Sequence, residues 1–95
     1  MSWFRPEDHE RQLVVQEKLL LEASEAVCRA LDERGMSRSE LAKLLSVRAS
    51  EITQRLSGGR NLTLRTLAEM LDLLGYDVHL SVVDRRADSR LGSPA

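Results

Sequence analysis

A short segment near the middle of the chain carries side chains that suit hydrogen bonding to nucleic-acid bases. Ile52 and Leu56 are one helical turn apart, so a helix over 49–56 would bury both on one face. Its opposite face then presents small and polar side chains: Ala49, Ser50, Thr53 and Gln54. A glutamine amide can pair with both polar atoms on the major-groove edge of adenine, while Ser and Thr hydroxyls suit several bases and an alanine methyl can contact thymine. This pattern predicts a base-reading surface.

Basic residues around this segment could bind the phosphates of a nucleic-acid backbone. Residues 34–66 contain seven Arg or Lys and two acidic residues, a net charge of +5, although the 95-residue chain has a net charge of −1. Residues 7–33 contain eight acidic and three basic residues, a net charge of −5. Phosphate contacts would position the protein and make binding salt-dependent, whereas a solvated surface of mixed charge is the alternative explanation. The predicted DNA-binding residues are Arg38, Arg48, Ala49, Ser50, Thr53, Gln54, Arg60 and Asn61.

The first element expected to position these residues is a long helix from Pro6 to about Arg34. Proline suits the first helical position, and Gly35 is a typical residue beyond the last one. Apolar residues recur every seven positions in two adjacent columns: Leu13, Leu20 and Val27, and Val14, Leu21 and Cys28. The half of this stripe near Val27 is expected to pack on the following helices. The half near Leu13 has no evident partner within the chain.

The next two helices form the predicted functional motif. Ser37 and Glu40 match the capping-box pattern and precede a short apolar helix. A turn at 46–47 joins this helix to the base-reading helix. Two short helices joined by a tight turn make a helix-turn-helix, here predicted from about Met36 to Leu56. The second helix of such a motif enters the major groove of DNA.

The predicted helical unit ends with one further helix. Residues 57–61 contain two glycines and are predicted to form a loop. Thr63 can cap a helix over 64–74, and Gly75 would end it. The core face predicted for this helix consists of Leu64, Leu67, Ala68 and Leu71.

The period changes in the C-terminal part of the chain. Tyr76–Val83 alternates apolar and polar residues, which predicts a half-buried strand. A lone strand cannot satisfy its own backbone groups, so we expect a homodimer formed through Tyr76–Val83 and the N-terminal helix. The polar tail Asp84–Ala95 is expected to be disordered. The predicted fold is therefore all-α, one domain over 1–83 with a long N-terminal helix and a single C-terminal β-strand.

Several classes of function lack support in the sequence. Cys28 is the single cysteine, and His9 and His79 are isolated, so the sequence predicts no disulfide, metal or cofactor site. No nucleophile and base are spaced for catalysis, and an enzyme is the least favoured reading. No apolar run is long enough for a signal peptide or a membrane span. We expect a cytoplasmic protein.

The motif resembles a known family at the level of its residues. The run from Gly35 to Gly58 (GMSRSELAKLLSVRASEITQRLSG), continued by GRNLTLRTL and by LGY at 74–76, resembles the XRE family of lambda-repressor-like helix-turn-helix proteins. Within that family, it is most similar to HigA-like antitoxins and small phage or mobile-element regulators. The resemblance covers about residues 20–82. It implies a DNA-binding domain that acts on operator DNA, usually as a dimer, and commonly represses its own promoter.

Three positions differ from what is usual in the family. Arg38 stands where a glutamine usually clamps a phosphate, which an arginine can also do with different geometry. Ser46 stands where a glycine usually makes the turn, and a left-handed conformation there would cost about 1 kcal/mol relative to glycine. Arg48 stands where a Ser or Thr cap is common, which predicts an uncapped start of the recognition helix.

A second function is left open by the sequence. An antitoxin binds a toxin protein, and the unpaired segment Tyr76–Val83 together with Trp3 and Phe4 could provide such a contact. These two aromatic residues could equally anchor the N-terminus on the body or join a dimer contact.

Overall fold

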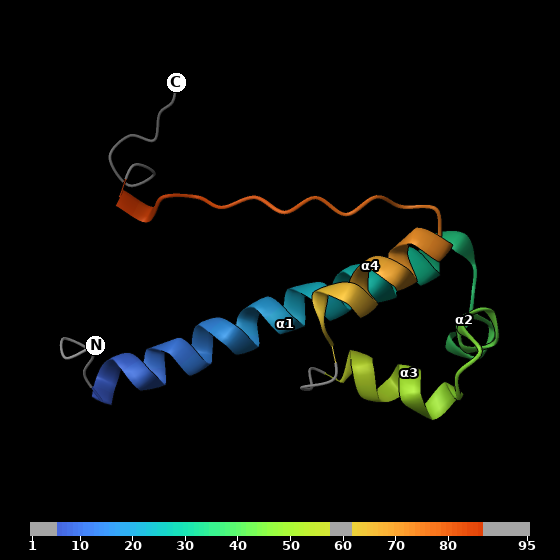
Figure 1. Cartoon of the computed structure of the whole chain (residues 1–95), viewed down its shortest axis with the longest axis horizontal. Helices are drawn as coiled ribbons and strands as arrows, with labels where there is room; N and C mark the ends of the chain where they lie inside the picture. Colours follow the sequence, from blue (N-terminus) through green and yellow to red (C-terminus); the bar gives the residue numbers. More distant parts are fainter. Residues whose placement is uncertain (1–5, 58–61, 87–95) are drawn as a thin grey trace, which may run out of the picture.

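The computed structural model describes residues 6–57 and 62–86. These residues form four helices, namely α1 (Pro6–Arg34), α2 (Arg38–Leu45), α3 (Ala49–Leu56) and α4 (Leu64–Leu73). Figure 1 shows that α4 lies beside the C-terminal half of α1, while α2 and α3 complete the bundle. The N-terminal half of α1 extends beyond the other helices (Figure 1). The predicted bounds of α1 and α3 are confirmed, and α4 ends one residue earlier than predicted.

Three helices end in the same backbone motif, with a residue in the left-handed region just after the helix. The positions are Gly35 after α1, Ser46 after α2 and Gly75 after α4, with φ of 64°, 60° and 88°. In each case the next residue returns a backbone hydrogen bond to the last turn, for example from the Met36 amide to the Leu31 carbonyl at 2.9 Å. These paired bonds satisfy carbonyls that the helix itself leaves free.

Side-chain caps define the starts of α2 and α4. The Glu40 amide donates to the Ser37 hydroxyl at 3.1 Å, and the Ser37 amide donates to the Glu40 carboxylate at 2.8 Å. These hydrogen bonds lower the pKa of the Glu40 carboxyl group, because they favour its charged form. Thr63 and Thr66 form the equivalent pair at the start of α4, with both bonds between 3.0 and 3.1 Å. The predicted capping box and the predicted Thr63 cap are both confirmed.

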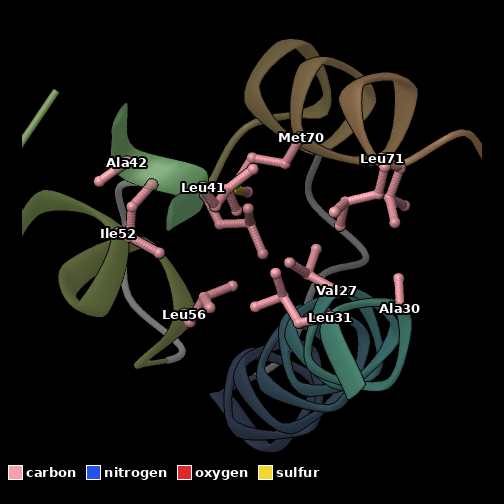
Figure 2. Packing of buried hydrophobic residues seen from close by; sticks show 11 residues of the cluster. Val27, Ala30, Leu31, Leu41, Ala42, Ile52, Leu56, Met70 and Leu71 are labelled. Atoms are coloured by element: carbon pink, nitrogen blue, oxygen red, sulfur yellow. The ribbon is translucent and has the colours of Figure 1, made fainter. Parts of the chain in front are cut away.

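The centre of the core takes one fully buried side chain from each helix. These are Val27 of α1, Leu41 of α2, Ile52 of α3 and Met70 of α4. Figure 2 shows Leu41 and Met70 close together, with Leu31 and Val27 facing them from α1. Because every helix contributes to one apolar cluster, the position of α3 depends on the other three helices.

The predicted core face of α4 is partly wrong. Leu71 is buried and Leu67 is half-buried, but Leu64 is 70% exposed and Ala68 is also exposed. Met70 packs at the centre instead (Figure 2). The buried stripe of α4 runs through Met70 and Leu71 to Leu74, so the helix is rotated about its axis relative to the prediction.

The predicted C-terminal β-strand is also wrong. Within residues 6–57 and 62–86 the structure contains helices and no strand. The segment Tyr76–Val83 is extended (Figure 1), and its residues from Asp77 onward are exposed. Alternating residues set the period of a strand, but a strand also needs a neighbour for its backbone groups, and the described part of this chain supplies none. The predicted tail from Asp84 lies mostly outside the described residues.

The start of this extended segment is held by the end of α1. Arg34 donates from Nε to the Leu74 carbonyl at 2.7 Å, and its guanidinium lies 4.3 Å from the centre of the Tyr76 ring. The Tyr76 hydroxyl donates to the Glu33 carboxylate, which raises the pKa of the tyrosine. These contacts join the C-terminal ends of α1 and α4 across the bundle.

Candidate nucleic-acid interface

The turn between α2 and α3 sets the direction of α3. Ser46 has φ 60° and ψ 40°, which is the left-handed conformation expected at this position. The Val47 amide donates to the Ala42 carbonyl at 3.0 Å and closes the turn. A serine in this conformation carries the steric cost that a glycine would avoid. The turn is therefore held by its backbone hydrogen bonds and by the packing of both helices.

The exposed face of α3 carries the four predicted base-reading residues. Ile52 and Leu56 are buried on the inner side of α3 (Figure 2). The outer side is exposed at all four predicted base-reading positions, which are Ala49, Ser50, Thr53 and Gln54. Burial of the inner face fixes the rotation of α3 about its own axis, so the outer side chains share one surface. Such a surface has the size and polarity that suit a major groove.

The N-terminal end of α3 lacks a side-chain cap. Arg48 occupies the capping position with φ −81° and ψ 150°, and its side chain accepts no hydrogen bond from the helix, as expected for a residue without an acceptor. Arg48 is exposed at the N-terminal end of α3, so its guanidinium can extend into solvent. A cation here lies beside the predicted base-reading residues, where a DNA phosphate could reach it.

A hollow of about 470 Å³ lies between the outer side of α3 and the first turns of α4. Six residues line it: Arg48, Ser50, Glu51, Gln54, Arg55 and Thr66. Three of these, Glu51, Arg55 and Thr66, were not among the predicted site residues. The spacing of Glu51 and Arg55 at i and i+4 is visible in the sequence and predicts an ion pair on a helix. Thr66 lies in the site only because the fold brings the start of α4 beside α3.

Arg55 is the most deeply placed charged residue of this surface. It is 9% exposed, and its Nη2 donates to the Glu51 carboxylate at 2.8 Å. Its Nη1 is buried and has no hydrogen-bond partner among the described residues. Without Glu51, this nearly buried guanidinium would therefore lack an ion-pair partner.

The remaining predicted residues lie elsewhere or cannot be placed. Arg38 is exposed at the first position of α2, and its Nη2 lies 3.9 Å from the Cys28 sulfur of α1. It belongs to a different part of the surface from the hollow beside α3. Arg60 and Asn61 fall outside the described residues.

Among residues 6–57 and 62–86, no group of His, Cys, Asp and Glu is arranged to hold a metal ion. Within those same limits, no helix is both long enough and apolar enough to cross a membrane.

Comparison with known proteins agrees with the geometry of α2 and α3. A family model described as helix-turn-helix matches residues 29–80, which is more than half of the chain. The match includes both helices of the motif, the turn at Ser46 and all of α4. No curated protein and no solved structure matches the chain.

Proposed function

The chain belongs to the XRE family of helix-turn-helix proteins, which are DNA-binding transcription regulators, and we propose that it binds a specific operator as a dimer and represses its own promoter. The observation that carries this proposal is the outer face of α3, exposed at every predicted base-reading position and held in place by Ile52 and Leu56.

In the proposed complex, α3 enters the major groove with its N-terminal half against the base edges. Gln54 pairs with an adenine, and the hydroxyls of Ser50 and Thr53 contact neighbouring bases. Arg48 at the N-terminal end of α3 and Arg38 at the start of α2 bind phosphates of the DNA backbone. Arg60 and Asn61 are proposed as further backbone contacts, on the basis of their residue types alone.

The small size of this face favours a dimer. A helix of eight residues reaches few base pairs, so one copy discriminates weakly among sequences. Two copies on a pseudo-palindromic operator double the contacts and fix the half-site spacing at about one helical turn. The shape and flexibility of the DNA between the half-sites would add to specificity.

The charge distribution supports this orientation. The net charge of +5 in residues 34–66 includes α2, α3 and the start of α4, whereas the net charge of −5 in residues 7–33 lies on α1. A polyanion is attracted to the first region and repelled by the second. DNA therefore approaches from the α3 side. We propose a cytoplasmic location, where the protein meets its DNA target.

Fluorescence anisotropy with DNA from the protein's own promoter tests the proposal. We expect tighter binding to this DNA than to a random duplex of equal length, and an affinity for both that falls as salt rises. Equal affinity for the two duplexes at every salt concentration would contradict a sequence-specific regulator.

A second proposed function is that of an antitoxin that holds a toxin protein. It is favoured by the extended segment after Tyr76, where Leu80, Val82 and Val83 are largely exposed. Exposed apolar side chains on one segment suit a protein partner. Co-expression with the product of the adjacent gene should then yield a stable complex. Loss of that complex on deletion of residues 77–86, with DNA binding retained, would assign the contact to this segment.

A further inference from the structure

The N-terminal half of α1 carries an apolar stripe that the rest of the chain does not cover. Leu13, Val14 and Leu21 are 48%, 66% and 53% exposed. Together with Leu56 at the C-terminal end of α3, they line a hollow of about 780 Å³. This is a larger hollow than the one beside the base-reading face.

The packing of α1 changes along its length. Val27 is fully buried and Ser24 is 5% exposed, because α3 and α4 cover this half of the helix. Toward the N-terminus, Leu20 is half-buried and the exposed stripe begins. A helix gains most of its stability from burying an apolar face, so a partner that covers the exposed half of α1 would stabilise it.

We propose that this stripe is the interface between two copies of the chain, with their α1 helices antiparallel and the two-fold axis between Glu17 and Lys18. This proposal rests on the dimer of the proposed function and names the surface that forms it. Val14 and Leu21 lie at equal distances on either side of that axis. Val14 of each copy therefore packs on Leu21 of the other copy. The N-terminal end of each α1 helix fills the hollow beside Leu56 of the other copy.

The charges at the centre of the stripe select this occupant and this orientation. Glu17 and Lys18 both line the hollow and are both exposed. In the antiparallel arrangement, Glu17 of each copy meets Lys18 of the other copy, which forms two equivalent ion pairs. A parallel arrangement would place Glu17 against Glu17 and bring two acidic first turns together, and like charges across an interface are unfavourable.

The same surface is poorly suited to DNA. It lies on the part of the sequence with a net charge of −5, and none of the four base-reading residues of α3 lines the hollow. A second copy bound here would leave those residues exposed in both subunits. The interface is therefore compatible with two α3 helices bound to one operator.

The first test replaces one apolar residue of the stripe and one matched residue outside it. Leu21→Glu places two carboxylates in the interface, so we expect the Kd of the dimer to rise at least about tenfold. Leu19→Glu is the control, because Leu19 is also exposed but lies about 160° around the helix from Glu17. Sedimentation equilibrium measures the Kd, and circular dichroism checks that both variants fold. An equal Kd for the two variants would overturn the proposal. So would a wild-type protein that is only monomeric at micromolar concentration.

The second test uses charge reversal at two exposed positions that the fold does not need. Glu17→Lys alone and Lys18→Glu alone should each weaken the dimer, because each places like charges together. The double variant E17K/K18E should restore it. Failure of the double variant to recover would overturn the antiparallel register. Operator binding is measured in parallel: a dimer that shows no preference for operator DNA contradicts the proposed function alone, whereas operator binding by a Leu21→Glu variant that stays dimeric contradicts this interface alone.

Discussion

Arg55 and Glu51 are joined by a hydrogen bond of 2.8 Å across one turn of α3, with the guanidinium nearly buried and the carboxylate about half exposed. The buried partner therefore depends on the exposed one for its neutralisation. Because Glu51 lies on the same hollow as Ser50 and Gln54, the ion pair also holds a carboxylate beside the proposed base-reading residues. A carboxylate there repels phosphates and can accept a hydrogen bond from cytosine.

The first prediction compares the two halves of this ion pair. Glu51→Ala leaves the Arg55 guanidinium unpaired and should lower the free energy of unfolding by about 1–2 kcal/mol, less than for a fully buried pair because Glu51 is in contact with water. Arg55→Met keeps the apolar stem and removes the charge, so it should cost less than about 1 kcal/mol. Urea denaturation without DNA measures both. A larger loss for Arg55→Met than for Glu51→Ala would contradict this dependence.

The second prediction concerns the left-handed turn. Ser46→Gly should raise the free energy of unfolding by about 1 kcal/mol, because glycine adopts this conformation without steric cost. Ser39→Gly is the matched control, since Ser39 is exposed within α2 and glycine there should cost about 0.5–1 kcal/mol. Thermal denaturation followed by circular dichroism should show Tm changes of opposite sign. Destabilisation by both substitutions would mean that the Ser46 side chain contributes something that the turn geometry does not explain.

The third prediction is a pH dependence at the start of α2. The two hydrogen bonds with Ser37 hold the pKa of Glu40 below its ordinary value. A carboxyl group with a lowered pKa in the folded state contributes stability above its unfolded pKa, about 4.3, and loses that contribution as the pH falls through the folded pKa. Unfolding measured from pH 7 to pH 3 should show this loss. Glu40→Gln keeps an acceptor for the Ser37 amide and should remove this part of the pH dependence; an unchanged profile would contradict the assignment.

The ends of the helices could be predicted because they depend on local chemistry. Gly35 and Gly75 end their helices in the left-handed region, and Ser37 and Thr63 begin theirs by accepting a hydrogen bond from a residue three positions later. The left-handed conformation of Ser46 is suggested instead by the family resemblance, in which a glycine usually makes this turn. Each of these features involves residues within five positions of one another, so the sequence contains the interaction almost completely.

The errors arose where the outcome depends on distant parts of the chain. The alternation in 76–83 predicts a strand only if a neighbouring strand exists, and the described residues provide none. The face that α4 buries is set by its approach to α1 and α2, so Met70 is at the centre and Leu64 is exposed. Arg55 is not among the predicted site residues, and its burial follows from the packing of α3.

The fourth prediction separates phosphate binding from base reading. Arg48→Ala should weaken binding to operator and random DNA by a similar factor, because a phosphate contact carries no sequence information. The slope of log Kd against log salt should fall by about one charge. Salt titrations with both duplexes measure it. A loss confined to the operator would instead assign Arg48 to base reading.

The role of α3 as the recognition helix is best tested by comparing wild-type protein and Gln54→Ala on a set of operators with each base pair changed in turn. If the outer face of α3 reads DNA, the substitution should remove discrimination at one A·T pair in each half-site, by about 1–3 kcal/mol, and leave the other positions unchanged. A uniform loss of affinity across all operators, or no loss at any position, would contradict the assignment of α3 as the recognition helix.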